Sequence, residues 1–194
     1  MNKIDFTKVP TPSYVVDERL LIKNLELLKS IIDRTGCKIL LAQKAFSMFH
    51  FYPLIGQYLS GTTASSLFEA RLGYEEMGME THIFNPAFEK EELTEIIPYV
   101  DHIVFNSLNQ WITYRDMIAD CGKKIDMGLR INPEYSEIET DIYNPCTKGS
   151  RFGVTIDKLE GVDVTGIDGL HFHTMCEQNS NVLVRTLHVV EQKF

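Results

Sequence analysis

Four side chains that can do chemistry stand at the ends of short apolar runs in the sequence. They are Lys44, Arg130, His171 and His173. A lysine at the end of a buried strand loses hydration, which favours the neutral amine that attacks a carbonyl to form a Schiff base. The same lysine can equally extend to solvent. Arg130 can clamp an anion or orient another charged group, or it can form an ordinary surface ion pair. Residue type and position alone leave these alternatives open.

The pair His171 and His173 has two interpretations. Residues two apart on a strand point to the same face, so both imidazoles could bind a metal, with Cys176 and Glu177 as further ligands. A metal-dependent hydrolase is therefore one hypothesis. The spacing is common, however, and one packed histidine beside one hydrogen-bonded histidine explains it equally well.

Glu69 and Cys176 also have a structural and a chemical interpretation. Glu69 could serve as an acid, but Ser66 and Glu69 together form the pattern of a capping box at a helix start. Cys176 could be reactive, although an unpaired cysteine is usually a small core residue. The four cysteines have no paired spacing, which indicates reduced thiols and neither a disulfide framework nor a zinc site.

The elements that would position these side chains alternate between strand and helix. Strands are predicted at 13–16, 37–43, 61–64, 81–84, 102–105, 124–131 and 167–173. Helices are predicted between Asp17 and Gly36, and at 52–59, 66–77, 89–97, 108–121 and 182–194. A loop of about 20 residues without periodicity follows Asn132-Pro133, long enough to suggest function or mobility. This order predicts a parallel α/β fold.

Six strand–helix units follow the first short strand. A (β/α)₈ barrel needs eight units and about 250 residues, whereas the chain has 194. In such a barrel the active site lies at the carboxyl ends of the strands, where the four side chains stand. The sequence therefore predicts an incomplete TIM barrel, and the edges of its first and last strands would be open.

Composition and charge restrict the class of function. The chain is 44% hydrophobic and 24% charged, as expected of a folded globular protein. Its formal net charge of −8 repels nucleic acid and would attract cationic small molecules if focused in a cleft. The N-terminus has no apolar targeting segment, and no apolar run approaches the roughly 20 residues of a membrane span. We therefore expect a cytoplasmic protein without a membrane or nucleic-acid partner.

Five short motifs occur in the order and approximate spacing of one enzyme family. They are Ala42-Gln43-Lys44-Ala45, Thr63-Ala64-Ser65-Ser66, Leu129-Arg130-Ile131-Asn132-Pro133, Ser150-Arg151-Phe152-Gly153 and Gly169-Leu170-His171-Phe172-His173. The chain resembles the pyridoxal-phosphate (PLP) decarboxylases of the alanine-racemase-like barrel fold, PLP fold type III, which include ornithine and diaminopimelate decarboxylases. Within this group it is most similar to the carboxynorspermidine/carboxyspermidine decarboxylases, because of the segments 64–73, 144–153 and 171–177.

The resemblance implies a role for four of the residues. Lys44 would hold PLP through a Schiff base, His173 would lie against the cofactor ring, and Arg130 would help to fix the site near Lys44. Cys176 falls where related decarboxylases often place a serine close to the phosphate. The histidine pair then needs no metal. The implied reaction is decarboxylation of carboxynorspermidine or carboxyspermidine, both cationic, in polyamine biosynthesis.

The resemblance also implies a longer protein. Members of the family run to about twice this length, and their C-terminal half carries an all-β domain and residues that reach across a homodimer. Residues 1–16 would contribute a strand to that β domain, and residues 17–194 would form an incomplete PLP-binding barrel. We therefore expect a truncated enzyme. The alternative is a stand-alone PLP-binding barrel that carries the cofactor without decarboxylase activity.

Overall fold

The computed structural model describes residues 4–194 and contains one sheet of six parallel strands in sequence order. The strands are β1 (Leu40–Ala42), β2 (Gly61–Ala64), β3 (Glu80–Phe84), β4 (His102–Phe105), β5 (Asp126–Arg130) and β6 (Gly169–His171). The α-helices are α1 (Glu18–Thr35), α2 (Tyr52–Ile55), α3 (Leu67–Glu76), α4 (Lys90–Ile96), α5 (Leu108–Ala119) and α6 (Ser180–Lys193). Short 3₁₀ turns occupy Phe6–Lys8, Phe49–Phe51, Ile97–Tyr99, Asp141–Tyr143 and Ile156–Lys158. The predicted parallel α/β fold is confirmed.

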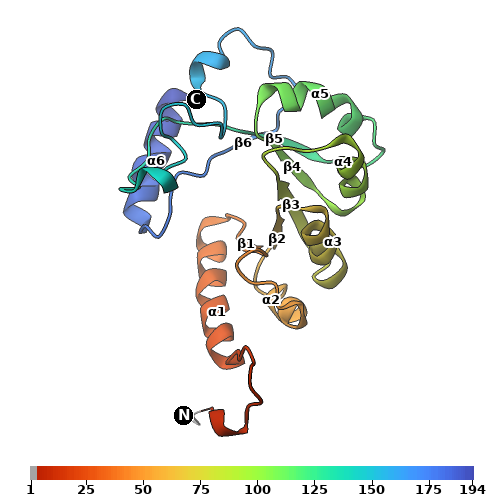
Figure 1. Cartoon of the computed structure of the whole chain (residues 1–194), viewed down its shortest axis with the longest axis vertical. Coiled ribbons are helices and arrows are strands. Elements are labelled where there is room, and N and C mark those ends of the chain that lie inside the picture. The colour runs from red at the N-terminus through yellow and green to blue at the C-terminus, as the bar shows by residue number, and fades with distance from the viewer. Residues whose placement is uncertain (1–3) are drawn as a thin grey trace.

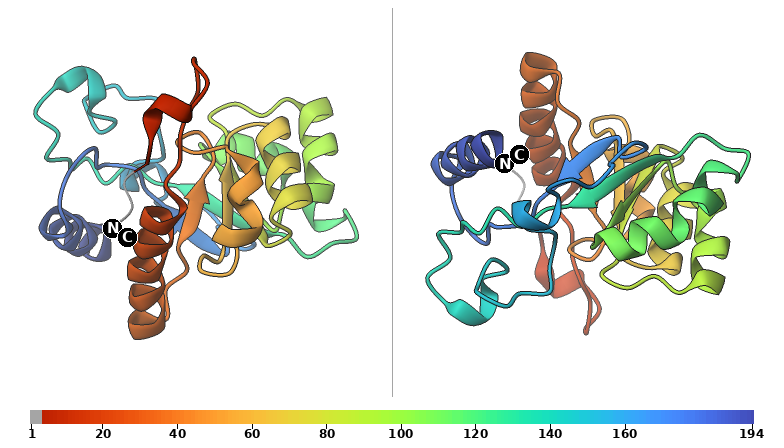
Figure 2. Two further views of the ribbon diagram at one scale, coloured as in Figure 1. Left: turned by 90° about the horizontal axis from the view of Figure 1, so that it is seen from below. Right: turned by 90° about the horizontal axis from the view of Figure 1, so that it is seen from above.

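The helices lie on two sides of the sheet. Figure 1 shows α3, α4 and α5 along one side of the strands, with α1 beyond the β1 end. In both views of Figure 2, α6 lies on the opposite side of the strands from α3–α5. Helices α3–α5 therefore cover one face of the sheet. The other face is directed toward the side on which α6 lies.

The main core fills the space between the strands and helices α3–α5. Side chains alternate along a strand, so Ile83 of β3 and Ile103 and Phe105 of β4 point toward the helices and are buried. They pack in one cluster with Leu93 of α4 and Trp111 of α5, each fully buried. This core holds the middle of the sheet rigid.

The first long helix ends where its capping residues predict. The Asp17 carboxylate accepts a hydrogen bond from the Arg19 N–H at 3.1 Å, and Gly36 closes the helix with φ of +72°. Leu25 on its buried face belongs to a second core cluster with Tyr52, Ile55 and Leu59. This cluster supports the β1 end of the sheet.

Three predicted elements differ in the structure. Residues 13–16 form no strand, and Tyr14 is 96% exposed, because no described strand lies beside them to pair with their backbone. Strands β1 and β6 are shorter than predicted, since each pairs on one side only. The connection from β5 to β6 agrees with the prediction of a loop, since within the described residues it contains 3₁₀ turns and no α-helix. The assignment of residues 1–16 to a β domain stays a prediction, and residues 1–3 lie outside the described part.

The second face of the sheet carries polar side chains. Glu80, His82 and Phe84 alternate with the buried residues of β3 and are half-buried on this face. His102 occupies the equivalent place on β4, in register with His82. In a closed barrel this face is the interior. The site described next lies at the edge of this face formed by the carboxyl ends of the strands.

Candidate functional site

A cleft of about 1030 Å³ opens at the carboxyl ends of the strands. Lys44, Arg130, His171 and His173 all line it, together with Phe84 and side chains of the loop 141–152. The structure thus brings together three of the four site residues predicted from the sequence, Lys44, Arg130 and His173. It also adds His171, which the sequence singled out without giving it a role in the family pattern.

Lys44 reaches the cleft because the residue before it is anchored. The Gln43 side chain is buried, donates to the Glu69 carbonyl at 2.8 Å and accepts from the Tyr52 hydroxyl at 3.1 Å. Burial, and next the charge of Glu69, raise the pKa of Tyr52 to about 12, so this hydroxyl stays protonated as a donor. The sequence suggested a desolvated lysine, but the Lys44 side chain is exposed in the structure. Its amine is therefore accessible from the cleft.

Arg130 is a buried cation with no carboxylate counter-ion within residues 4–194. It is 5% exposed and lies between the rings of Phe84 and Phe152, with its guanidinium carbon 4.9 Å and 4.7 Å from their centroids. Within residues 4–194 its guanidinium forms no ion pair with a carboxylate. Burial lowers its pKa from the ordinary value. Such a group is positioned to receive an anionic ligand.

His171 presents an unsatisfied nitrogen beside this cation. Its ring stacks on Phe84 with a centroid separation of 5.3 Å, and its Nε2 is buried without a hydrogen-bond partner in the described structure. Burial, and then the charges of Arg130, His173 and Lys44, lower the pKa of His171 to about 4. Although His173 is exposed as a whole residue, the partial burial of its ring, and next the charge of Arg130, lower its pKa as well. Both imidazoles are therefore neutral at pH 7.

The segment Ser150-Arg151-Phe152-Gly153 is fixed to the end of β4 by Asn106. The Asn106 amide donates to the Arg151 carbonyl at 2.9 Å and its oxygen accepts from the Gly153 N–H at 3.1 Å. Val154 then forms an isolated parallel bridge with Ile131, just beyond β5. This arrangement places Phe152 against Arg130.

Replacing Gly153 by alanine is expected to destabilise the protein by about 2 kcal/mol or more. Gly153 has φ of +79°, and a Cβ there would lie 2.7 Å from the carbonyl carbon of Ile131. The matched control is Gly149→Ala, where φ is +82° but nothing lies within 4 Å, so only the backbone cost of about 1 kcal/mol applies. Urea unfolding monitored by Trp111 fluorescence measures both. Equal losses in the two variants would contradict the close packing of Gly153.

The loop that follows β5 is attached to α6. Arg185 of α6 donates two hydrogen bonds of 2.6 Å to the two oxygens of the Glu137 carboxylate. The Gln178 side chain donates to the Glu137 carbonyl at 2.8 Å, and Lys193 donates to the Pro133 carbonyl at 2.6 Å. Residues 141–145 of this loop line the cleft. The last helix therefore holds one wall of the cleft.

Replacing Glu137 by glutamine is expected to loosen this wall. The hydrogen bonds from Arg185, and next from Tyr135, lower the pKa of Glu137 to about 2, so the pairing is complete above pH 4 and is lost as the pH falls toward 2. Hydrogen exchange at pH 7 should become faster at residues 134–145 and stay unchanged in β2–β4. Asp33→Asn, which removes an exposed ion pair to Lys29 in α1, is the control. Unchanged exchange at 134–145 in Glu137→Gln would contradict the attachment.

Two sequence candidates lie away from the cleft. Cys176 is exposed and does not line it, so the phosphate contact suggested for Cys176 stays a prediction. The Glu69 carboxylate accepts from the Ser65 N–H at 2.7 Å, and the Ser66 hydroxyl accepts from the Glu69 N–H at 3.3 Å. The structure thus supports the capping role of Glu69. Within residues 4–194, His171 and His173 belong to no group of three histidine, cysteine or acidic side chains that could hold a metal ion.

Sequence inspection missed Phe84 and Asn106. Each follows or ends an apolar run at the carboxyl end of a strand, in Ile83-Phe84-Asn85 and in Phe105-Asn106-Ser107. That position is the signal that could have identified them. In a sequence, an aromatic residue at that position is usually assigned to the core, and an asparagine at that position is usually assigned to a turn.

The cleft has the charge and the chemistry that a phosphorylated aldehyde requires. Its lining holds four cationic side chains, Lys44, Arg130, Lys148 and Arg151, against one carboxylate, Asp141, although the whole chain carries −8. An accessible amine, an unpaired guanidinium, an unsatisfied imidazole nitrogen and several rings converge there. The residues present therefore fit PLP.

No family model matches the chain. Two curated relatives match over 97% of it: carboxyaminopropylagmatine decarboxylase of Synechocystis sp., 42% identical over 188 residues, and carboxynorspermidine/carboxyspermidine decarboxylase of Campylobacter jejuni, 40% identical over 189 residues. The chain spans about half the length of these relatives, 48% of each. The resemblance inferred from the five motifs is thereby confirmed.

Solved structures give the same result for the fold. The crystal structure of carboxynorspermidine decarboxylase from Campylobacter jejuni in complex with norspermidine matches 96% of the chain and 47% of its own, with a TM-score of 0.86 and 38% identity. Lysine decarboxylase from Selenomonas ruminantium, whose complex with PLP and cadaverine also matches, has the same fold at 19% identity or less. The chain has the fold of the N-terminal half of these decarboxylases.

Proposed function

We propose that this chain forms the cofactor-binding half of a PLP-dependent decarboxylase that acts on a carboxylated polyamine in polyamine biosynthesis. The observation that carries the proposal is the cleft itself. The cleft is lined by Lys44, by two neutral histidines and by Arg130, whose positive charge has no carboxylate partner within residues 4–194. It lies at the end of the sheet where such barrels bind substrates. The similarity of about 40% to decarboxylases of carboxylated polyamines supports the substrate class.

The residues of the chain would divide the work of binding PLP and substrate. Lys44 supplies the amine that reacts with the aldehyde carbon, since it is exposed within the cleft. Arg130 offers its charge to an anionic group, either the phosphate or the substrate carboxylate. His173 would cover the ring. When bound, PLP delocalises the electron pair that remains on Cα after CO₂ departs.

His171 would hold a hydrogen bond to the bound ligand. Its Nε2 is buried without a partner, and a buried polar atom of this kind costs about 1–3 kcal/mol until it is satisfied. Because the ring is neutral at pH 7, it adds no charge beside Arg130. A hydrogen bond from a polar ligand atom to this nitrogen would therefore offset that cost.

The substrate carries positive charge on its amines. Asp141 is the carboxylate among the cleft residues, but the lining carries four cationic side chains, so the net charge of −8 is not focused in the cleft and the substrate class rests on the similarity to the relatives. We propose carboxynorspermidine or carboxyspermidine, with carboxyaminopropylagmatine as a third substrate because the relative of that name is equally similar. We also propose that the protein acts as a homodimer in the cytoplasm, without nucleic-acid or membrane partners. Within residues 4–194 no helix is long and apolar enough to cross a membrane.

Release of CO₂ from each of the three carboxylated polyamines tests the proposal. The assay uses the purified protein with PLP, alone and mixed with a chain supplying the equivalent of the C-terminal half of the Campylobacter relative. We expect release from at least one compound in the mixture. PLP binding with no release from any of them would favour the alternative, a PLP-binding barrel that carries the cofactor. Light scattering of the same samples tests the dimer.

A further inference from the structure

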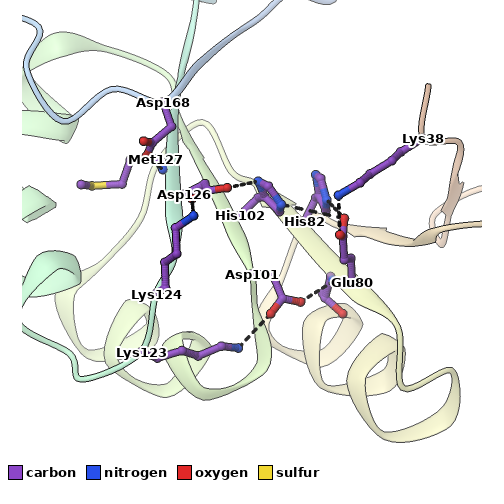
Figure 3. Close-up of polar contacts among 11 residues, drawn as sticks. Lys38, Glu80, His82, Asp101, His102, Lys123, Lys124, Asp126, Met127 and Asp168 are labelled. Carbon is purple, nitrogen blue, oxygen red and sulfur yellow. Dashed lines mark hydrogen bonds and ion pairs between the residues drawn. The ribbon is translucent and has the colours of Figure 1, made fainter. Parts of the chain in front are cut away.

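A second polar cluster lies on the same face of the sheet and reaches the cleft at His82. It is built on Glu80 and His82 of β3 and His102 of β4, and Figure 3 shows their side chains pointing toward one another. His82 and His102 are register partners, so the backbone pairing itself brings them together. His82 precedes Phe84 by two residues, which places the cluster about 7 Å down the strand from the ring that packs on Arg130.

The three side chains offer three ligand atoms in a small volume. The Glu80 Oε2 lies 3.2 Å from His82 Nε2 and 3.9 Å from His102 Nε2, and all three atoms lie within 4.8 Å of one another. The two imidazole rings stack with centroids 3.8 Å apart. Ligand atoms around a tetrahedral zinc ion are about 3.3 Å apart, given bonds of about 2.0–2.1 Å. Small side-chain rotations would reach that spacing.

Neighbouring groups support this arrangement. The Asp126 Oδ2 faces His102 Nδ1, the nitrogen on the far side of the ring from the cluster, at 3.7 Å, which is longer than a hydrogen bond. Lys38 holds the other oxygen of Glu80, Oε1, which leaves Oε2 toward the histidines. Lys38 is 55% exposed, so it can move away from an incoming cation. No other group of three histidine, cysteine or acidic side chains within residues 4–194 is so placed.

We infer that Glu80, His82 and His102 form a binding site for a divalent transition metal of the Zn²⁺ class that borders the cofactor cleft, since His82 lines the cleft whereas Glu80 and His102 do not. Two imidazoles and one carboxylate are a ligand set that zinc accepts, with a fourth position left for water. A bound ion would join β3 to β4 on the inner face of the sheet. The inference does not depend on the proposed function, since none of the three residues is assigned to PLP or substrate.

Metal binding to the purified, chelator-treated protein tests the site. Zn²⁺ is titrated by calorimetry, and Co²⁺ by visible absorption, because thiolate ligation gives Co²⁺ a distinct intense band and so reveals binding by any of the four cysteines. We expect one ion per chain, a Co²⁺ spectrum of nitrogen and oxygen ligands, and at least tenfold weaker binding in His82→Gln, in His102→Gln and in Glu80→Gln.

Two controls make the result specific. His188→Gln removes an exposed histidine of α6 that contacts Gln192 at 3.0 Å, and Lys44→Ala removes the predicted cofactor lysine; both variants should bind the metal as the unaltered protein does. Circular dichroism checks that each variant is folded. Absence of stoichiometric binding, a thiolate spectrum, or affinity that is unchanged in folded His82→Gln and His102→Gln would overturn the inference.

Discussion

Replacing Lys44 by alanine is expected to abolish the covalent attachment of PLP. Lys44 provides an accessible amine in the cleft, next to the unpaired Arg130 and the two histidines. The covalent adduct forms through an amine that alanine lacks. The unaltered protein, incubated with PLP and reduced with borohydride, should gain the mass of the reduced adduct and lose its visible absorbance. The variant should show neither change.

Lys148→Ala is the matched control, because Lys148 lines the same cleft from the loop and supplies the same charge. It should keep the adduct, with weaker binding of PLP as the cleft loses a cation. Digestion of the reduced protein should place the added mass on the peptide that contains Lys44. Modification of Lys148 in its place, or an adduct that survives in Lys44→Ala, would contradict the assignment of Lys44 and with it the proposed chemistry.

Acid is expected to destabilise the protein through His171, before the carboxylates are protonated. The pKa of His171 is about 4 in the folded protein, below its ordinary value of 6.5, so the unfolded chain takes up a proton that the folded protein does not. Stability is therefore complete above about pH 6.5 and falls as the pH approaches 4. The gap between the two pKa values corresponds to about 3 kcal/mol.

Urea unfolding at several pH values between 7 and 4, without added PLP, measures this loss. His171→Asn keeps a neutral polar side chain, although a smaller one, and cannot titrate, so the stability of the variant should vary over the same pH range by about 3 kcal/mol less than that of the unaltered protein. The control is His188→Gln, which removes an exposed histidine on α6. If His171→Asn and the unaltered protein lost stability in parallel, another group would be responsible for the acid sensitivity.

The sequence predicted the fold because its signals are local. Asp17 and Gly36 mark both ends of α1, and the short β-rich runs of the middle strands are bounded by turns and caps. Residues 13–16 have the same β-rich composition but form no strand. A strand requires a neighbour, and neighbours are set by the tertiary structure, which composition does not report.

The candidate site was predictable in part for the same reason. Position at the carboxyl end of a strand singled out Lys44, Arg130, His171 and His173, and the resemblance to the decarboxylase family gave three of them, Lys44, Arg130 and His173, their predicted roles. The partners of Arg130 could not be predicted, because Phe84 and Phe152 are 68 residues apart in sequence and meet only in the fold. The unsatisfied nitrogen of His171 likewise depends on packing around Phe84.

The attachment of the loop after β5 to α6 has a consequence for how ligands reach the cleft. Glu137 and Pro133 are bound to the last helix at two places, while residues 141–145 border the opening. Widening that opening therefore requires the helix to shift or these bonds to break. The rates of ligand entry and departure are then set partly by α6, and substitutions on this helix should change those rates more than they change the affinity.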